Sequence, residues 1–583
     1  MEKNNLETLR HSTAHVLATA VLEMFPEAKF GTGPAVENGF YYDFDLPRTL
    51  IPEDLPLLEE KMKAVIKTNF PFERAEISAA EARADFTKLG QTYKLELIAD
   101  LEKAGEKISV YKTNGFVDLC SGPHIESTGK INPTAFKLTK ISGAYWKADE
   151  KNPQMQRIYG VVFESKEKLK EYLHMQEEAE KRDHRKLGKE LGLFIFSDLV
   201  GPGLPIYTPK GATIRREIIN YSNELQSSIG YQEVHTPNIN KAELFKISGH
   251  YDKYKEDMLR VVSNYTKEEY FLKPMSCPQH TQIFASQMRS YRDLPLRIAD
   301  FANLYRDEKP GELSGLTRLR CFCQDDGHSF CREDQIKDEF SSVLGAIKQA
   351  METYVMDYKI RLSFWDPQHP EKYLGDAAVW EKSQKLLEDI LIENKIEYFK
   401  AEGEAAIYGP KMDLISNDSL GRKWQISTIQ LDFIMPQRFN LTYIDSDGKE
   451  KTPVMIHRAI VGSPERFLGI LIEHYAGAFP TWLAPVQAVI IPVSEEKFGA
   501  YAKDVETRLI ASGVRVELDA SAEGLGKKIR DAEKQKIPYM LVVGEKEMTD
   551  GSVAVRQRGD KNQEVLKVDE FVAKILEEIK NKK

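Results

Sequence analysis

A long charged segment with few apolar positions divides the chain near residue 165. From Ser165 to Glu190 the sequence is rich in Lys and Glu, and its sparse apolar positions are Leu169, Leu173 and Leu187. Ser165 is a suitable helix N-cap, and so thin an apolar stripe is more typical of a connector helix than of a core element. A Gly-Pro-Gly break at residues 201–203 is expected to end the segment. The chain is therefore expected to fold as several domains.

Length and composition agree with a multidomain globular enzyme. A chain of 583 residues corresponds to three or four domains at about 150 residues each. The hydrophobic fraction of 42% and the charged fraction of 29% argue against wholesale disorder. A net charge of −9 disfavours a general nucleic-acid coat, although a local basic face stays possible. Five cysteines, an odd and sparse set, fit a reducing compartment. With no signal core and no run of 18 apolar residues, we expect a cytoplasmic protein without a membrane span.

The two ends of the chain have different patterns. Residues 1 to about 160 read as an α+β unit, with a helix over Leu6–Met24, a Gly/Pro turn at residues 31–34 and short strands such as residues 39–44. After Pro485 strands alternate with helices, which predicts a small α/β domain with a mostly parallel sheet.

Two histidines four residues apart open the first candidate site. His11 and His15 share one helix face, and Asp118, Cys120 and His124 follow far downstream. This set could bind zinc, or it could form a metal-free hydrolytic pocket in which imidazoles act as bases on water. It could also be two surface histidines and an unrelated buried thiol.

A second cluster contains Cys321, Cys323, His328 and Cys331. Taken locally it looks like a compact zinc knuckle, but Cys-x-Cys is an unusual zinc spacing. Residues 316–324 also read as a strand, in which both thiols would share one face.

Three arginines are candidates for binding phosphate groups. Arg306, Arg318 and Arg466 each lie near the end or start of an apolar element, and guanidinium forks suit triphosphate oxygens. Each alone could equally be a surface salt-bridge partner. The Gly-x₄-Gly-Lys-Ser/Thr pattern is absent, which excludes a P-loop nucleotide site.

Taken together, these motifs resemble the threonyl family of class II aminoacyl-tRNA synthetases, over nearly the whole chain. Residues 230–237 are similar to motif 1, residues 305–308 and 318–322 to motif 2, and residues 462–466 to motif 3. The threonyl-specific signatures are similar to residues 273–278, 324–328 and 454–459. Departures from the family pattern are Ser276, Gln279 and Cys321, and the small amino-terminal domain of many relatives is expected to be absent.

The resemblance implies an α+β multidomain fold with a class II antiparallel-sheet catalytic core. The expected parts are an α+β editing domain over residues 1–163, a helical linker over 164–195, the catalytic domain over 196–482 and an α/β anticodon-binding domain over 485–583. Motif 1 implies a homodimer.

The resemblance also recasts the metal question. In this family one Cys and two His from distant segments hold one Zn²⁺ per chain, which here are Cys277, His328 and His457. The remaining thiols near His328 would then be ordinary cysteines. Three protein ligands leave zinc an open position, which threonine can fill. Further threonine contacts are implied for Gln324, Asp326 and Tyr408.

For ATP, which arrives with Mg²⁺, the resemblance implies that Arg306 holds the α-phosphate and the amino-acid carboxylate. Arg318 and Arg466 would hold the outer phosphates. Phe322 and Arg466 would enclose adenine, and Glu308 would meet its edge. Further groups at the reacting centre would be Lys411, Gln425 and Gln430.

The remaining family residues concern tRNA. His250 resembles the candidate base for the ribose hydroxyl, and Glu547 and Arg556 resemble anticodon-reading residues. Hydrolysis of mischarged Ser-tRNA by water, without a metal, is implied for the amino-terminal residues His11, His15, Lys94, Asp118, Cys120 and His124.

The expected function is a threonine–tRNA ligase that takes threonine, ATP and tRNA(Thr) as partners and edits Ser-tRNA(Thr). Three alternatives are a stand-alone deacylase, a non-catalytic tRNA-binding paralogue and a ligase for serine, proline or histidine. Intact arginine and zinc-ligand motifs argue against the first two, and the amino-terminal histidine domain argues against the third.

Overall fold

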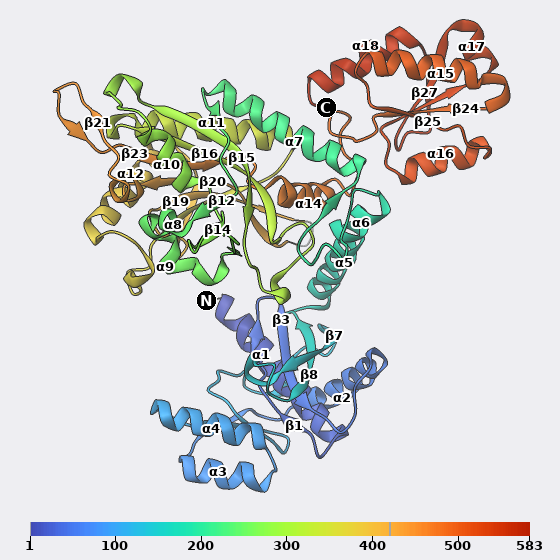
Figure 1. Cartoon of the computed structure of the whole chain (residues 1–583). Coiled ribbons are helices and arrows are strands. Elements are labelled where there is room, and N and C mark those ends of the chain that lie inside the picture. Colours follow the sequence, from blue (N-terminus) through green and yellow to red (C-terminus); the bar gives the residue numbers. More distant parts are fainter. Residues whose placement is uncertain (1, 419–420) are drawn as a thin grey trace. The chain divides into compact units, whose positions relative to one another are not determined.

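The computed structural model describes residues 2–418 and 421–583, in two compact units. The first unit ends at Glu177, and the second extends from Glu178 to Lys583 (Figure 1). Within the described ranges, no helix is both long enough and apolar enough to cross a bilayer.

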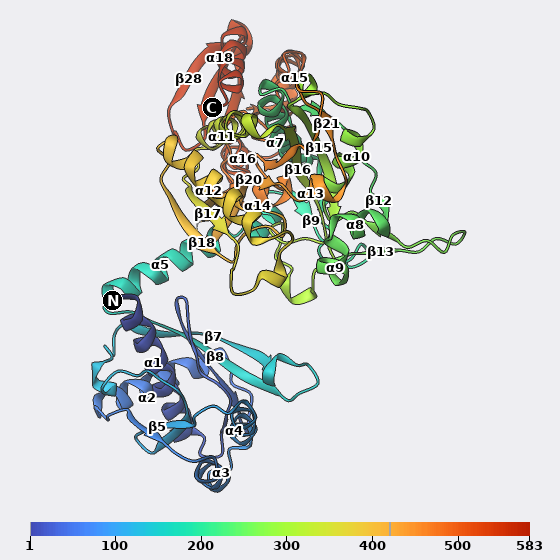
Figure 2. The ribbon, with the colours of Figure 1, turned by 90° about the vertical axis from the view of Figure 1, so that its left-hand side faces the viewer.

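The first unit is built around a sheet with strand order β1-β3-β8-β7, to which β2 adds at β3, all antiparallel. Helix α1 lies along this sheet (Figure 2). Its middle is buried there, where the apolar residues Ala14, Val16, Leu17 and Ala18 are inaccessible. The elements are α1 (Glu2–Met24), β1 (Lys29–Phe30), β2 (Ala35–Val36), β3 (Gly39–Asp45), α2 (Leu55–Lys67), β7 (Phe136–Tyr145) and β8 (Gln154–Val162).

A second, three-stranded sheet in this unit has the order β4-β5-β6. Ser78 begins one of its covering helices with a reciprocal cap, because its hydroxyl accepts from the Glu81 N–H while the Glu81 carboxylate accepts from the Ser78 N–H. The elements are β4 (Glu73–Glu76), α3 (Ala79–Lys88), α4 (Thr92–Ala104), β5 (Ser109–Thr113) and β6 (Phe116–Leu119).

The charged segment expected to be one connector is two helices. The Ser165 hydroxyl accepts from the Lys168 N–H at 3.3 Å, so the predicted cap is confirmed, and α5 covers Lys166–Arg182. Asp183 then caps a separate helix, α6 (His184–Glu190), and the helical segment ends there and not at residues 201–203. Leu187 on α6 is buried in the core of the second unit, so α6 is a core element.

The second unit is centred on an eight-stranded sheet of order β11-β15-β16-β23-β20-β19-β17-β18. Its pairs are antiparallel, as expected, except for the parallel edge pairs β11/β15 and β17/β18. The strands are β11 (Gln232–Glu233), β15 (Leu296–Tyr305), β16 (Cys321–Cys331), β17 (Lys359–Phe364), β18 (Tyr398–Glu402), β19 (Lys411–Asn417), β20 (Lys423–Asp432) and β23 (Val454–Ala459).

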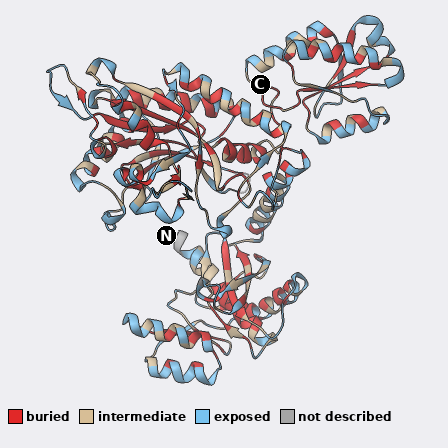
Figure 3. Ribbon diagram, in the orientation of Figure 1, coloured by how far each residue is buried: buried red, intermediate tan, exposed pale blue. Residues whose placement is uncertain are grey.

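Helices α7 (Pro209–Ser228), α11 (Ile336–Thr353) and α14 (Pro464–His474) contribute to the largest core cluster against this sheet. Figure 3 shows the buried residues concentrated on its strands and on α14. Smaller elements complete the region: β9 (Phe194–Ile195), β10 (Ile206–Tyr207), β12 (Ile239–Lys241), α8 (Ala242–Ser248), α9 (His250–Tyr254), β13 (Arg260–Val261), β14 (Tyr270–Leu272), α10 (Cys277–Ala285), α12 (Ala377–Glu393), α13 (Met435–Arg438), β21 (Tyr443–Ile444) and β22 (Glu450–Lys451).

The central strand β16 begins later than residues 316–324 predict. Residues 314–318 form a tight turn instead, closed by the Ser314 N–H and the Arg318 carbonyl at 3.2 Å. From Cys323 onward the side chains alternate. Asp325 accepts from Ser222 on α7 and Ser329 donates to Glu339 on α11, so the odd positions face the helices. The even positions 324, 326 and 328 line a cavity on the other face.

The carboxy-terminal part of this unit has a sheet of order β25-β24-β26-β27-β28. The first three strands are parallel, as predicted, and an antiparallel hairpin completes it. The last strand was not predicted, because its side chains are mostly exposed and polar. The elements are β24 (Ala488–Pro492), α15 (Glu495–Ala511), β25 (Val516–Leu518), α16 (Leu525–Lys534), β26 (Tyr539–Val543), α17 (Glu545–Asp550), β27 (Ser552–Gln557), β28 (Gln563–Lys567) and α18 (Val568–Lys580).

Candidate functional site

A cavity of about 570 Å³ lies on the open face of the eight-stranded sheet. Most of the residues predicted to bind the metal, the amino acid or ATP line it, although they come from segments as far apart in the sequence as His250 and His457. These residues are His250, Cys277, Arg306, Glu308, Arg318, Gln324, Asp326, His328, Tyr408, Lys411, Gln430 and His457.

Three further predicted residues lie one contact away from this lining. The Phe322 ring lies under the Arg306 guanidinium, 5.1 Å from its carbon, and the Gln425 carbonyl oxygen is 3.3 Å from Lys411 Nζ. Arg466 repels Arg306 electrostatically. Phe322 therefore stacks on the Arg306 guanidinium at the border of the cavity.

Three side chains in the cavity can share one metal ion. The ligand atoms of Cys277, His328 and His457 lie within 4.8 Å of one another, and all three residues are buried. Strand pairing places the histidines directly opposite each other, with His328 Nε2 2.9 Å from His457 Nδ1. Cys277 is the first residue of α10. Among the residues that the structure describes, Cys321, Cys323 and Cys331 belong to no group that could hold a metal, because Cys323 and Cys331 lie on the other face of β16 and His328 is grouped with Cys277.

Two residues that the sequence analysis missed hold these histidines. His457 Nε2 is 2.9 Å from Asp432 Oδ2, and His328 Nδ1 is 2.6 Å from His280 Nδ1. Such contacts fix the ring orientation, so that His457 Nδ1 and His328 Nε2 remain directed at the shared site. The sequence held one signal for His280: it lies three residues after Cys277 on α10, and residues at this spacing share a helix face.

The electrostatics of this set suit a divalent cation. Burial, with Asp326 and Asp432 nearby, raises the pKa of the Cys277 thiol well above its ordinary value. Burial lowers the pKa of His328, which keeps the imidazole neutral. Imidazole nitrogens and a thiol that needs a neighbouring cation to ionise are the donor set that zinc prefers.

Polar groups beside the three ligands can bind an amino acid. Asp326 accepts from the Ser276 N–H at 3.2 Å, and burial raises the pKa of its carboxyl. The Tyr408 hydroxyl donates to the Gln430 carbonyl oxygen at 2.7 Å, and its ring stacks on His457 with centroids 4.5 Å apart.

The arginines form a positive region next to this pocket. Arg318 donates to Glu308 at 2.9 Å and to Glu312 at 3.0 Å. Burial lowers the pKa of Arg306 and, with repulsion from the other two arginines, that of Arg466. Guanidinium groups held this close together favour a bound polyanion.

His250 lies at the edge of the same cavity as a neutral base. Its Nδ1 is 2.8 Å from the Ser248 hydroxyl, and burial lowers its pKa to about 3. The imidazole is therefore uncharged at neutral pH and can accept a proton.

The first unit has its own cavity of about 590 Å³, lined by His11, His15, Lys94, Asp118 and Cys120. The two histidines lie on one face of α1, as predicted. Cys120 Sγ is 3.4 Å from His11 Nε2 and 3.4 Å from Nε2 of His124, which lies beside the cavity. The six predicted residues are therefore brought together.

Charge compensation in this cavity involves a residue that the sequence analysis missed. The Tyr42 hydroxyl donates to Asp118 Oδ2 at 2.6 Å, Lys94 forms an ion pair with Asp118, and His15 Nε2 is 3.3 Å from the same carboxylate. Burial raises the pKa of Cys120 to about 12 and lowers the pKa of His11. A neutral thiol and neutral imidazoles can order a water molecule. The ligand atoms of His11, His15, Cys120 and His124 are also close enough for a metal ion.

The two predicted anticodon residues have separate partners within the carboxy-terminal part. Glu547 accepts from the Gly544 N–H at 2.9 Å at the start of α17. Arg556 on β27 donates to Glu533 at 2.6 Å.

Three family models match the chain. The descriptions are "tRNA synthetase class II core domain (G, H, P, S and T)" for residues 260–475, "Anticodon binding domain" for residues 487–578, and "Threonyl and Alanyl tRNA synthetase second additional domain" for residues 108–159.

Curated relatives are similar over nearly the whole of this chain. The threonine–tRNA ligase of Gloeobacter violaceus is 49% identical over 99% of this chain and 93% of its own. Threonine–tRNA ligase 1 of Bacillus subtilis is 48% identical over 99% of this chain and 89% of its own.

Two solved structures are also similar. A crystal structure described as the RNA binding domain of threonyl-tRNA synthetase from Cryptosporidium parvum is 39% identical, with a TM-score of 0.65 over 68% of this chain and 98% of that chain. A prolyl-tRNA synthetase from the same organism, at 18% identity and a TM-score of 0.53 over 68% of this chain and 75% of that chain, is similar in fold.

Proposed function

The chain belongs to the threonine–tRNA ligase family, and from this premise we propose that the cavity beside β16 activates threonine with ATP and transfers it to tRNA(Thr). The observation that carries this proposal is the convergence of Cys277, His328 and His457, within 4.8 Å, beside a cluster of arginines. Such a cavity has a place for a metal, for an amino acid and for a triphosphate.

Cys277, His328 and His457 would hold one Zn²⁺ per chain. A zinc ion bound by these three protein groups would supply open coordination positions for the amino and hydroxyl groups of threonine. Asp326 and Gln324 would contact the hydroxyl, and Tyr408 the amino group. Valine has the same shape but would leave those buried polar groups unpaired, a difference that can reach 10⁴-fold or more.

Activation requires the threonine carboxylate to attack the α-phosphate of ATP, which is taken as its Mg²⁺ complex. Arg306 would neutralise both reacting anions, and Arg318 and Arg466 the outer phosphates, with Phe322 and Glu308 at the adenine. To bind ATP, Arg318 must exchange its carboxylate partners for phosphate oxygens. Positioning and charge neutralisation dominate this chemistry. Further contacts at the reacting centre would come from Lys411, Gln425 and Gln430.

In the transfer step His250 would accept the proton of the tRNA ribose hydroxyl. Its neutral state at pH 7 fits this role. Glu547 and Arg556 would contact anticodon bases.

Serine differs from threonine by one methyl group, which yields only about 10–200-fold discrimination. We therefore assign hydrolysis of Ser-tRNA(Thr) to the cavity of the first unit. His11 and Cys120 would order the attacking water, with His15, Lys94, Asp118 and His124 around the ester. Lys94 forms an ion pair with Asp118, and we propose, as the family resemblance implies, that this hydrolysis needs no metal.

The domain assignment of residues 1–163, 164–195, 196–482 and 485–583 and a homodimer are part of the same proposal. The hairpin β9–β10 and its loop expose apolar side chains that a second copy could cover: Ile195, Phe196, Leu199, Val200 and Ile206. All five cysteines are free, which fits the reducing cytoplasm.

Amino-acid-dependent ATP–pyrophosphate exchange across the twenty amino acids tests the proposal. We expect strong exchange with threonine, weak exchange with serine and none above background with valine. Absence of exchange with every amino acid would favour a hydrolase acting on tRNA, and a maximum with proline or histidine would refute the threonine assignment.

A further inference from the structure

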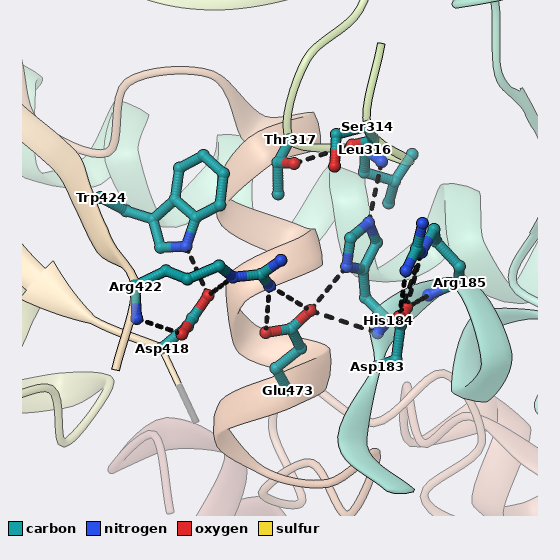
Figure 4. A network of polar contacts seen from close by, with 10 residues as sticks. All are labelled: Asp183, His184, Arg185, Ser314, Leu316, Thr317, Asp418, Arg422, Trp424 and Glu473. Atoms are coloured by element: carbon teal, nitrogen blue, oxygen red, sulfur yellow. Dashed lines mark hydrogen bonds and ion pairs between the residues drawn. The ribbon is translucent and has the colours of Figure 1, made fainter. Parts of the chain in front are cut away.

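A buried histidine outside the substrate cavity connects the linker to the ATP-binding region (Figure 4). His184 is the first residue of α6 and is 1% exposed. Its Nδ1 is 2.7 Å from Glu473 Oε1, and its Nε2 accepts the Leu316 N–H at 3.0 Å. Because the carboxylate is an acceptor and the amide is a donor, Nδ1 carries the proton and Nε2 is bare. Asp183, His184 and Glu473 lie close enough for a metal, but both ring nitrogens are already engaged.

The loop that His184 contacts carries Arg318. Within this loop the Thr317 N–H and hydroxyl donate to the Ser314 carbonyl at 2.9 and 2.7 Å. Gly315 has φ +48°, and a Cβ on it would overlap His184 Nε2 and lie 2.8 Å from Arg185 Cγ. The imidazole therefore fills the space under this turn.

Helix α14 holds two consecutive residues of the same loop. Arg466 Nε donates to the Thr317 carbonyl at 3.0 Å. Glu473 is seven residues later, about two turns, and so lies on the same helix face; it reaches Leu316 through His184. One contact is direct and the other is made through the imidazole.

Glu473 is itself held in place. Arg422 Nη2 lies 3.3 and 3.2 Å from its two carboxylate oxygens. Asp418 accepts from Arg422 Nε at 2.5 Å and from Trp424 Nε1 at 2.7 Å. Because a buried carboxylate is stable only with such partners, this network gives Glu473 one orientation and His184 one tautomer.

We propose that His184 is a positioning residue for ATP binding, which holds the 314–318 loop so that Arg318 and Arg466 converge on the triphosphate. This inference rests on the proposed roles of those two arginines. Neither the His184 ring nor Glu473 lines the substrate cavity, so the effect is exerted through the loop backbone.

Two substitutions separate the two contacts of the ring. In His184→Asn the side-chain amide takes the place of Nδ1, so the Glu473 contact is kept and the Leu316 contact is lost. In His184→Gln the carbonyl oxygen reaches the place of Nε2, so the Leu316 contact is kept. His369→Asn, at an exposed histidine, serves as the matched control.

The readout is ATP–pyrophosphate exchange of the full chain, with KM for ATP and for threonine measured separately, together with the thermal unfolding midpoint. We expect H184N to raise the KM for ATP about tenfold, as for one lost hydrogen bond, with KM for threonine within twofold. H184Q should stay within about threefold of wild type for both substrates. A purely structural histidine would instead change both KM values together, or neither, and that result overturns the inference.

If H184N does not fold, Gly315→Ala tests the inference instead. Its added methyl group overlaps the His184 ring and so disturbs the same contact from the side of the loop. A raised KM for ATP alone supports the inference, and an unchanged KM for ATP overturns it. Arg466→Ala distinguishes the two levels of the argument. If R466A leaves KM for ATP unchanged, the proposed arginine role is wrong; if R466A raises it and H184N does not, only the positioning role is wrong.

Discussion

The environment of Cys277 disfavours ionisation of its thiol unless a cation is bound nearby. Burial, together with Asp326 and Asp432, raises its pKa, and yet its Sγ lies within 4.8 Å of a ring nitrogen of His328 and of His457. A divalent cation reverses this balance, because it binds the thiolate and accepts both imidazole lone pairs.

We therefore expect Cys277→Ser to lose bound zinc and at least 100-fold of threonine-dependent exchange. Metal content of the purified protein by elemental analysis and the exchange rate check this result. Cys321→Ser, a half-buried thiol on the same strand as His328, is the control and should keep its metal. Full zinc occupancy in C277S would contradict the ligand assignment.

The thiol of Cys120 should act in its neutral form. Its pKa of about 12 leaves it protonated at pH 7, between His11 Nε2 and His124 Nε2. Cys120→Ala is expected to slow deacylation of Ser-tRNA(Thr) at least tenfold, while threonine-dependent exchange is unchanged. Deacylation is followed with labelled Ser-tRNA(Thr). Cys120→Ser, which keeps a polar hydrogen, should be affected less, and equal deacylation by wild type and C120A would remove Cys120 from the mechanism.

The pH dependence of transfer follows from the lowered pKa of His250. A group with a pKa of about 3 is unprotonated above that value, so its contribution as a base is lost only as the pH falls through about 3. We expect single-turnover transfer from preformed threonyl-adenylate to tRNA to change less than twofold from pH 8 to pH 6. A histidine of ordinary pKa, near 6.5, would lose most of its activity over this range, and a loss of that size would contradict the buried, neutral state.

At the scale of an element, β16 is constrained on both faces. Gly327 pairs with Arg458, which is 1% exposed and contacts Asp325 and Gln226 on the helix side. A Cβ at Gly327 would overlap the Arg458 guanidinium, which Asp325 and Gln226 hold in place.

Gly327→Ala should therefore destabilise the second unit by about 1–3 kcal/mol, as overpacking does. Thermal unfolding followed by circular dichroism measures this as a lower midpoint. Gly345→Ala, within α11, is the matched control: no atom lies within 4 Å of its added methyl, and helix propensity favours alanine. A midpoint for G327A at or above that of wild type would show that the strand can shift to make room.

For the whole molecule, the question is whether activation and tRNA recognition are separable. Arg556 belongs to the carboxy-terminal sheet, and its known contact is to Glu533 within that part of the chain. We expect Arg556→Ala to lower kcat/KM for tRNA charging at least tenfold, because edge contacts to a base are lost, with exchange unchanged. Arg508→Ala, an exposed arginine paired with Asp569, is the control. Equal charging by R556A and R508A would contradict the anticodon role.

Local signals predicted much of this architecture. Alternation of strands and helices after Pro485 gave the three parallel strands, and the i, i+4 spacing gave the paired histidines on α1. The resemblance to a known family supplied the remaining predicted residues of both cavities. Asp432, His280 and Tyr42 were missed because their roles depend on contacts across the fold that no spacing encodes. Residues 316–318, which belong to the turn at residues 314–318, were read as strand because His184, which supports this turn, is 132 residues away from Leu316 in the sequence.

The alternation along β16 also limits how this chain can diverge. Cavity-facing and helix-facing side chains occupy alternate positions of the same eleven-residue strand, so the loss of a single residue would exchange the two sets. Substitutions at even-numbered positions of this strand can change the cavity while the packing against the helices is preserved. Substitutions at odd-numbered positions can change that packing while the cavity is preserved. Homologues that diverge from this chain can therefore accept substitutions along this strand, but they cannot accept an insertion or a deletion within it.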